Sequence, residues 1–148
     1  PQARRSMLLG SFMAGAAFTN AGLGATHAIA MAAGAIHHTP HGVTIALALP
    51  DVMRYNATSA PDRYAEIARL LGEDLTATGR HEAAEAAARG VERLAADVGI
   101  DGGLASLGLE SEDVGHVAER ASKLERLTVG NPRRIGREEL ETIIRDAL

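Results

Sequence analysis

Four of the six histidines in this chain lie between positions 27 and 41, inside a long segment without charged side chains. That segment runs from Ser6 to Pro50 and contains no Asp, Glu, Lys or Arg. Polar chemistry within it therefore depends on histidine, and neutral imidazole is the commonest metal ligand in proteins. Apolar surroundings keep an imidazole neutral because burial disfavours the charged ring. The pattern indicates a buried metal site, with His27 and His41 as the candidate ligands.

These two histidines belong to consecutive segments that are each predicted to be helical. His27 lies in an Ala- and Gly-rich helix over about residues 23–35, and His41 opens the next apolar helix directly after Thr39 and Pro40. Proline is favoured at the first helical position and Thr39 can cap there, so we expect His41 in the first turn. The partial positive charge at a helix N-terminus also disfavours a protonated ring. Two helices can therefore direct one imidazole each toward a common point.

The spacing alone leaves the assignment open. His27 and His41 are fourteen positions apart, which matches no short zinc motif such as the i, i+4 histidine pair of a metalloprotease helix. Two buried histidines hydrogen-bonded to the backbone explain the pattern equally well. His37 and His38 fall in the turn between the helices, where we expect solvated loop histidines. The alternative for that pair is a pocket wall that faces a substrate.

A longer composite pattern surrounds these histidines. It combines a histidine in an Ala-rich helix, a Pro-His-Gly fourteen residues later, and an apolar run that ends in Leu-Pro and an asparagine; here these are Gly22-Leu23-Gly24, His27, Pro40-His41-Gly42, Leu49-Pro50 and Asn56. This pattern resembles the iron-dependent (group III) alcohol dehydrogenase family. The resemblance extends from SMLLGSFMAGAAFTNAGLG near the start to NPRRIGREELETIIRDAL at the end of the sequence.

The resemblance implies that His27 and His41 are two ligands of a divalent metal, iron or zinc. Imidazoles by themselves do not distinguish these ions from nickel or copper. In the family an aspartate and a further histidine, both from an earlier part of the polypeptide, complete the site, and a glycine-rich domain binds NAD or NADP. These 148 residues contain neither. We therefore expect a truncated or split enzyme whose partner is the missing nucleotide-binding domain or chain.

The implied function is that of the metal-binding helical half of an NAD(P)-dependent alcohol dehydrogenase or aldehyde reductase. Its metal would polarise the oxygen of a small alcohol or aldehyde during hydride transfer. Many members of the family carry a second histidine one turn after His27, but this chain has Met31 there. Methionine cannot transfer a proton, so no residue of this chain is assigned a catalytic role. The chain alone is then expected to be inactive.

A second class of function stays open, namely a stand-alone, non-catalytic helical domain that self-associates or binds a partner. In that case the two histidines are satisfied core groups. A homo-oligomer is compatible with either class. If the family's nucleotide-binding domain is missing, the uncharged region around His27, His38 and His41 is expected to form an exposed adhesive patch.

Composition excludes several other classes. The net charge is −4, and residues 51–148 hold all nineteen acidic residues with thirteen of the basic ones, so a nucleic-acid surface is not expected. Twelve alanines and six glycines make residues 6–50 too weakly hydrophobic for a membrane span. Cysteine is absent, which excludes disulfides and thiolate metal sites. No signal peptide is recognisable, and we expect a cytoplasmic protein.

Apolar periodicity predicts helices, and only residues 43–49 show a weak alternation of the kind that a strand would have. The expected helices cover about residues 3–18, 23–35, 40–49, 62–71, 80–98, 104–107, 112–123 and 137–147. Pro50 is expected to break the third helix, because proline removes a donor and clashes with the preceding turn. Leu94 and Val98 are expected in the buried stripe of the long helix over residues 80–98. The predicted fold is a single all-α domain over residues 1–148, a helical bundle like the C-terminal domain of the family.

Overall fold

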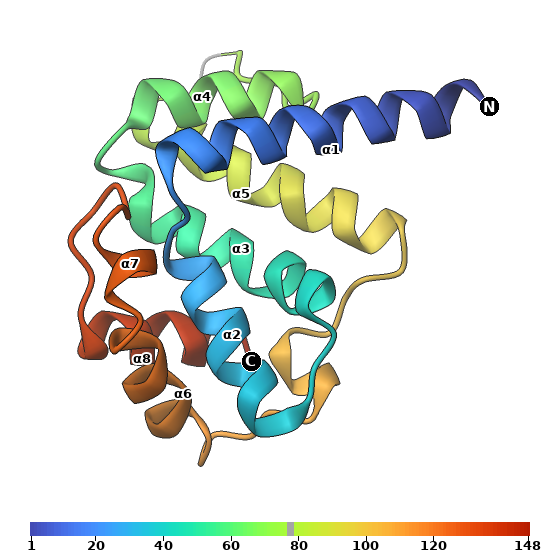
Figure 1. The fold of residues 1–148 in the computed structure, drawn as a ribbon. Helices are drawn as coiled ribbons and strands as arrows, with labels where there is room; N and C mark the ends of the chain where they lie inside the picture. The colour runs from blue at the N-terminus through green and yellow to red at the C-terminus, as the bar shows by residue number, and fades with distance from the viewer. Residues whose placement is uncertain (77–78) are drawn as a thin grey trace.

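The computed structural model of the chain describes residues 1–76 and 79–148, and all regular secondary structure in that part is helical (Figure 1). The elements in chain order are α1 (Gln2–Ala21), α2 (Ala25–His37), α3 (His41–Ala57), α4 (Pro61–Leu70), α5 (Arg80–Asp97), the 3-10 helix η1 (Leu104–Leu107), α6 (Val114–Ser122), α7 (Glu125–Thr128) and α8 (Arg137–Asp146). The predicted all-α fold is confirmed. No helix of the described residues combines the length and hydropathy that a membrane crossing requires.

The main core surrounds α2, which packs against α3, α6, α7 and α8. Small side chains line α2, and its alanines at positions 25, 28, 32 and 33 are almost fully buried. Because these side chains are short, the neighbouring helices approach closely and larger residues fill the remaining space. The largest fully buried residues include Ile29, Leu104, Val117, Leu140 and Ile144. The helix that carries His27 is therefore held on several sides.

A second, smaller core joins α4 and α5 to the C-terminal half of α3. It contains Met53, Ala68 and residues 86–88. Arg54 on α3 adds polar contacts to α5, since its guanidinium nitrogens lie 2.6 Å from Glu92 and 3.5 Å from Glu85. The same guanidinium group bonds Asp51 within α3 at 2.8 Å. The C-terminal half of α3 therefore links the two cores.

Pro50 does not break α3, contrary to the prediction. The helix runs from His41 to Ala57 with Pro50 inside it, and the proline ring is buried. Pro50 offers no N–H to the carbonyl oxygen of Ala46, one turn earlier in the helix. Packing of α3 against α2, α5 and α8 outweighs a local cost of about 3 kcal/mol. The helix thus continues because both of its halves are fixed in the cores.

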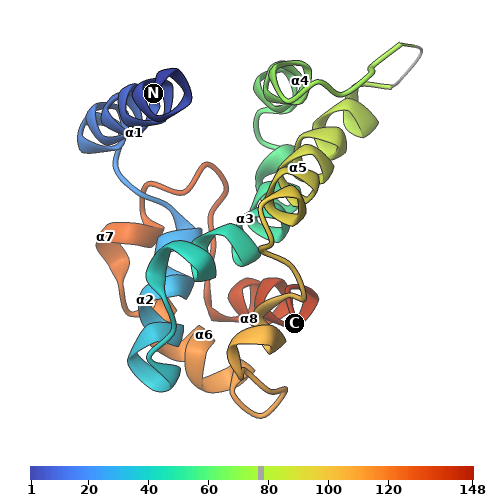
Figure 2. The same cartoon turned by 90° about the vertical axis from the view of Figure 1, so that its right-hand side faces the viewer.

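Apolar residues are exposed on two helices, and for the stripe of α5 this exposure contradicts the prediction. No described residue of α1 is buried, and Figure 2 shows this helix standing apart from the rest of the bundle. On α5 the expected stripe residues Leu94 and Val98 are 55% and 67% exposed. An apolar pattern predicts which residues avoid water, but it does not specify whether this chain contains the surface that covers them.

Candidate metal centre

The rings of His27 and His41 lie side by side. His27 is in the first turn of α2 and His41 is the first residue of α3, and their ring centres are 5.7 Å apart at an interplanar angle of 61°. Two imidazoles that bind one ion at a metal–nitrogen distance of about 2.0 Å have ring centres roughly 5 Å apart. The separation of the two ring centres is therefore compatible with a shared metal ion.

Local structure at the start of α3 differs in one detail from the prediction. Pro40 is the N-cap residue, with φ −64° and ψ 116°, rather than the first helical residue, and no side chain caps the helix. The Thr39 hydroxyl instead accepts a hydrogen bond from the Thr44 hydroxyl at 2.8 Å. The prediction that His41 occupies the first turn is confirmed.

Electrostatics favour a neutral ring at His27. Partial burial lowers its pKa below the ordinary 6.5, and the nearby His41 lowers this pKa further. The positive end of the α2 dipole acts in the same direction. The Phe18 ring, with its centre 6.4 Å from that of His27, brings the end of α1 to the site. A neutral imidazole has a free lone pair, which is the form that binds a metal.

A pair of buried amides fixes the N-terminus of α2. Asn131 Oδ1 accepts hydrogen bonds from the backbone N–H of Ala25 at 3.3 Å and from Asn56 Nδ2 at 3.1 Å. In return Asn131 Nδ2 donates to Asn56 Oδ1 at 2.7 Å and to the Arg133 carbonyl at 2.7 Å. A Cβ on Gly24 would lie 3.2 Å from Asn131 Oδ1, so glycine permits this close approach. The amide pair connects the turn that carries His27 to the end of α3.

Sequence reasoning missed this amide pair. The motif that ends at Asn56 and the segment that begins at Asn131 give no sign of a contact between the two residues. The partners are 75 positions apart, and Asn131 lies in a turn-rich segment where asparagine is common for purely local reasons. No local signal in the sequence could have shown that the two amides meet.

The remaining residues near the candidate centre play different parts. His37 is not a free loop histidine, because its Nε2 lies 2.8 Å from a carboxylate oxygen of Asp113. The backbone N–H of Glu110 lowers the pKa of Asp113, as does the nearby His37. His38 ends α2 in the left-handed conformation, with φ 53°, and its side chain is exposed, as predicted. Met31 is 43% exposed on α2.

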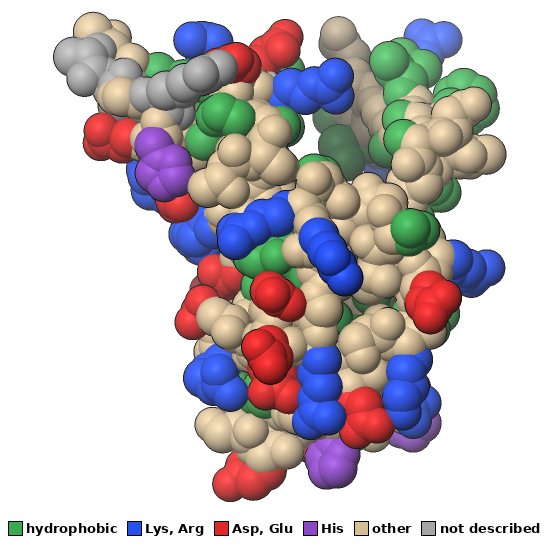
Figure 3. Space-filling model, turned by 90° about the vertical axis from the view of Figure 1, so that its left-hand side faces the viewer, with side chains coloured by type: hydrophobic (Ala, Val, Ile, Leu, Met, Phe, Trp, Pro, Cys, Tyr) green, Lys and Arg blue, Asp and Glu red, His purple; other side chains and the backbone are tan. Residues whose placement is uncertain are grey.

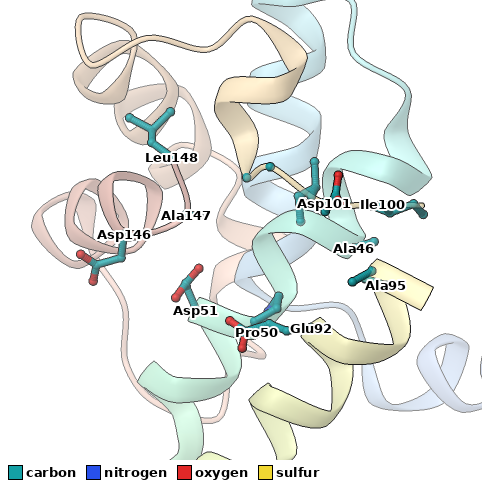
Figure 4. Close-up of a pocket in the computed structure, with 14 residues that line it drawn as sticks. Ala46, Pro50, Asp51, Glu92, Ala95, Ile100, Asp101, Asp146, Ala147 and Leu148 are labelled. Atoms are coloured by element: carbon teal, nitrogen blue, oxygen red, sulfur yellow. The ribbon is translucent and has the colours of Figure 1, made fainter. Parts of the chain in front are cut away.

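The described residues contain no group of three or more His, Cys, Asp or Glu side chains arranged to hold a metal ion. A separate pocket, with a cavity volume of about 400 Å³, lies between α3, α5 and the C-terminus (Figure 4). Its lining carries four acidic side chains, those of Asp51, Glu92, Asp101 and Asp146, and neither His27 nor His41. Burial raises the pKa of Asp51, although its bond to Arg54 opposes that rise. The two histidines thus stand as a pair apart from the acidic pocket.

Comparison with known proteins gives one consistent family. The model of the C-terminal part of the Fe-containing alcohol dehydrogenase family matches residues 1–148. The chain is 41% identical over 146 residues to 1,3-propanediol dehydrogenase of Klebsiella pneumoniae, covering 99% of this chain and 38% of that protein. It is 42% identical over 131 residues to lactaldehyde reductase of Escherichia coli, covering 88% of this chain and 34% of that protein.

Solved structures agree with these sequence relatives. The fold superposes on 1,3-propanediol oxidoreductase with a TM-score of 0.94 and 41% identity, over 99% of this chain and 38% of the other. An alcohol dehydrogenase from Oenococcus oeni gives a TM-score of 0.93 at 37% identity, again over 99% and 38%. The chain thus spans about two fifths of the length of these relatives. The chain belongs to the iron-containing alcohol dehydrogenase family and corresponds to its C-terminal helical domain.

Proposed function

We propose that this chain supplies two ligands, His27 and His41, to the metal centre of an NAD(P)-dependent alcohol dehydrogenase or aldehyde reductase. The observation that carries the proposal is the 5.7 Å separation of the two rings, which belong to the first turns of α2 and α3. The donor set fits a borderline divalent ion such as iron or zinc. When bound, such an ion polarises the oxygen of a small alcohol or carbonyl substrate during hydride transfer.

The chain's own part in this chemistry is to present and hold the two imidazoles. The amide pair Asn56–Asn131 fixes the start of α2, and the lowered pKa of His27 keeps its lone pair available. Two protein ligands are fewer than the three or more of typical catalytic sites. We therefore infer that further ligands, and the nicotinamide, come from a nucleotide-binding domain or chain that joins this one.

Metal content of an assembled enzyme tests the proposal. A suitable protein is a chimera in which this chain replaces the matching part of the Klebsiella pneumoniae 1,3-propanediol dehydrogenase, to which it is 41% identical. We expect the chimera to retain iron or zinc, and His27→Ala or His41→Ala to lower the bound metal at least tenfold. His116→Ala is the matched control, because His116 is exposed on α6. Equal metal content in all four proteins would contradict the proposal.

A further inference from the structure

Helix α1 presents large apolar side chains on three sides, and none of its described residues is buried. With 3.6 residues per turn, its large exposed side chains fall into three pairs, and successive pairs lie about 100° apart around the helix axis. The pairs are Met7 with Phe18, Leu8 with Phe12, and Leu9 with Met13. These six side chains are 47–74% exposed. Residues 6–21 carry no charge. A helix that is hydrophobic all round is normally buried, so α1 has the composition of a central helix.

A hollow separates α1 from α4 and α5. Figure 2 shows α1 standing apart from α4 and α5, and the space-filling view from the opposite side shows hydrophobic side chains beside this hollow (Figure 3). The opposite elements also leave large apolar residues uncovered, namely Ile67 and Leu70 on α4 and Leu94 and Val98 on α5. The hollow therefore has apolar residues on the helices of both walls.

The accessible surface of the chain is larger than its mass predicts. A folded monomer of 15.4 kDa exposes about 7,200 Å² by the usual scaling with mass. This chain exposes 8979 Å². The excess of roughly 1,800 Å² is about twice what one partner buries in a standard protein interface. This excess is accessible surface that a folded monomer of the same mass would bury.

The separation of α1 from the rest of the helices also occurs in a relative. This helix contains 20 of the 148 residues, too large a share to be displaced in a superposition with a TM-score of 0.94 over 99% of the chain. In 1,3-propanediol oxidoreductase, therefore, α1 occupies the same position, and most of that protein's chain lies outside the match. The hollow is thus a feature of the fold rather than of an isolated fragment.

We propose that the hollow between α1 and the α4–α5 pair is the docking site for apolar helices from the part of the dehydrogenase polypeptide that this chain does not span. The occupant is helical because the backbone of α1 is already paired internally and offers no edge for a strand. The faces it presents are uncharged, since an unpaired charge buried against residues 6–21 would lose its hydration without compensation.

A second copy of this chain fits the surface less well. A two-fold dimer buries one self-complementary patch on each subunit, whereas α1 presents apolar residues on three sides. The contact also reaches the candidate metal centre, because Phe18 at the end of α1 lies against His27. Docking on α1 thereby orders one wall of that centre. The inference rests on the proposed function, since the occupant is the remainder of the same enzyme.

Cysteine accessibility tests the proposal directly, because the natural chain contains no cysteine. Met7→Cys, Leu8→Cys and Leu9→Cys place one thiol on each side of α1, and Ser111→Cys in an exposed turn is the control. Maleimide labelling is followed at each site by peptide mass spectrometry, in the 148-residue chain and in the chimera with the Klebsiella pneumoniae enzyme. We expect comparable rates at all four sites in the dilute chain. In the chimera the three α1 sites should slow at least tenfold while position 111 is unchanged.

Two labelling results overturn the inference. One is labelling of the α1 sites in the chimera that is as fast as at position 111. The other is protection in the chain alone that grows with its own concentration, which identifies a second copy as the occupant. A chimera that retains metal with α1 accessible rejects the docking site but leaves the proposed function standing. A chimera with α1 protected and no bound metal supports the docking site and contradicts the proposed function. Hydrogen exchange on the monomeric chain gives an independent check. An uncovered helix should exchange rapidly, and protection of α1 equal to that of α2 would also overturn the inference.

Discussion

At the scale of single residues, the candidate centre depends on two imidazoles in unlike surroundings. His27 is half-buried in the first turn of α2, whereas His41 is exposed at the start of α3. Burial is the larger of the two causes that lower the pKa of His27, and the proximity of His41 is the smaller. The two causes can be separated experimentally, because substitution of His41 removes only the second.

The first prediction concerns the titration of His27. In the metal-free chain its NMR-measured pKa should lie below 6.5, and His41→Ala should raise it only part of the way back, because burial remains. Between the folded pKa of His27 and 6.5, the unfolded chain binds more protons than the folded chain does. Stability should therefore fall as the pH drops below 6.5 toward the folded pKa, and His27 should contribute no pH dependence at higher pH. His116→Ala is the control and should leave the value unchanged. A His27 pKa above 6.5 would refute this account of the site.

At the scale of elements, the position of α2 relative to α3 is set by contacts remote in sequence. The N-terminus of α2 is tied to the end of α3 and to the segment before α8 through the Asn56–Asn131 pair. The C-terminal end of α4 packs on α5 at Gly90, where a Cβ would lie 2.9 Å from two carbon atoms of Leu71. A substitution at either contact should lower the free energy of unfolding.

Removal of the Asn131 amide should destabilise the chain. Asn131→Ala removes the hydrogen-bond partner of Asn56 Oδ1 and of the Ala25 N–H, which costs about 1–3 kcal/mol per unsatisfied group. Chemical denaturation measures the loss. Asn20→Ala is the matched control, because its exposed side chain bonds only Ala16 within α1, and it should change stability by no more than about 0.5 kcal/mol. Additive effects of Asn131→Ala and Asn56→Ala would show that the amides do not act as a pair.

A methyl group at Gly90 should force α4 and α5 apart. Gly90→Ala brings its Cβ against Leu71, and overpacking of this kind costs about 1–3 kcal/mol. Gly115→Ala in α6 is the comparison, since only a side-chain nitrogen of Arg137 lies within 4 Å, at 3.9 Å. That substitution should stabilise its helix by about 0.5–1 kcal/mol. Thermal melting should show a lower melting temperature for Gly90→Ala and a higher one for Gly115→Ala. An increase in melting temperature for Gly90→Ala would contradict the packing described for α4 and α5.

At the scale of the whole molecule, the chain has a well-packed core around α2 and an uncovered side around α1. The uncovered surface was expected around His27, His38 and His41. The large exposed apolar residues concentrate on α1, whose Phe18, 47% exposed, lies beside His27. On α2, Met31 is 43% exposed. The molecule therefore has the surface of a domain that belongs to a larger assembly.

The last prediction is that the chain alone binds zinc weakly. Four-ligand zinc sites bind with an apparent 10–16 kcal/mol, so two ligands should supply roughly 5–8 kcal/mol, which corresponds to a Kd in the micromolar to sub-millimolar range. Titration calorimetry measures this at neutral pH, with His116→Ala as the control. Nanomolar one-to-one binding that His27→Ala abolishes would show that the described residues form a complete site after all.

The sequence by itself determined the helical periodicity, the approximate bounds of the helices other than α3 and α7, the uncharged segment around the histidines, and the family. These depend on local patterns: apolar spacing, capping residues and a motif that extends from Gly22 to Asn56. Only the tertiary structure decided that α3 continues through Pro50, that Asn131 meets Asn56, that His37 pairs with Asp113, and that α1 is uncovered. The physical reason is that a local pattern states a residue's preference for burial or bonding, whereas the partner that satisfies it is supplied by residues far away in the chain. For α1, the described residues do not supply that partner.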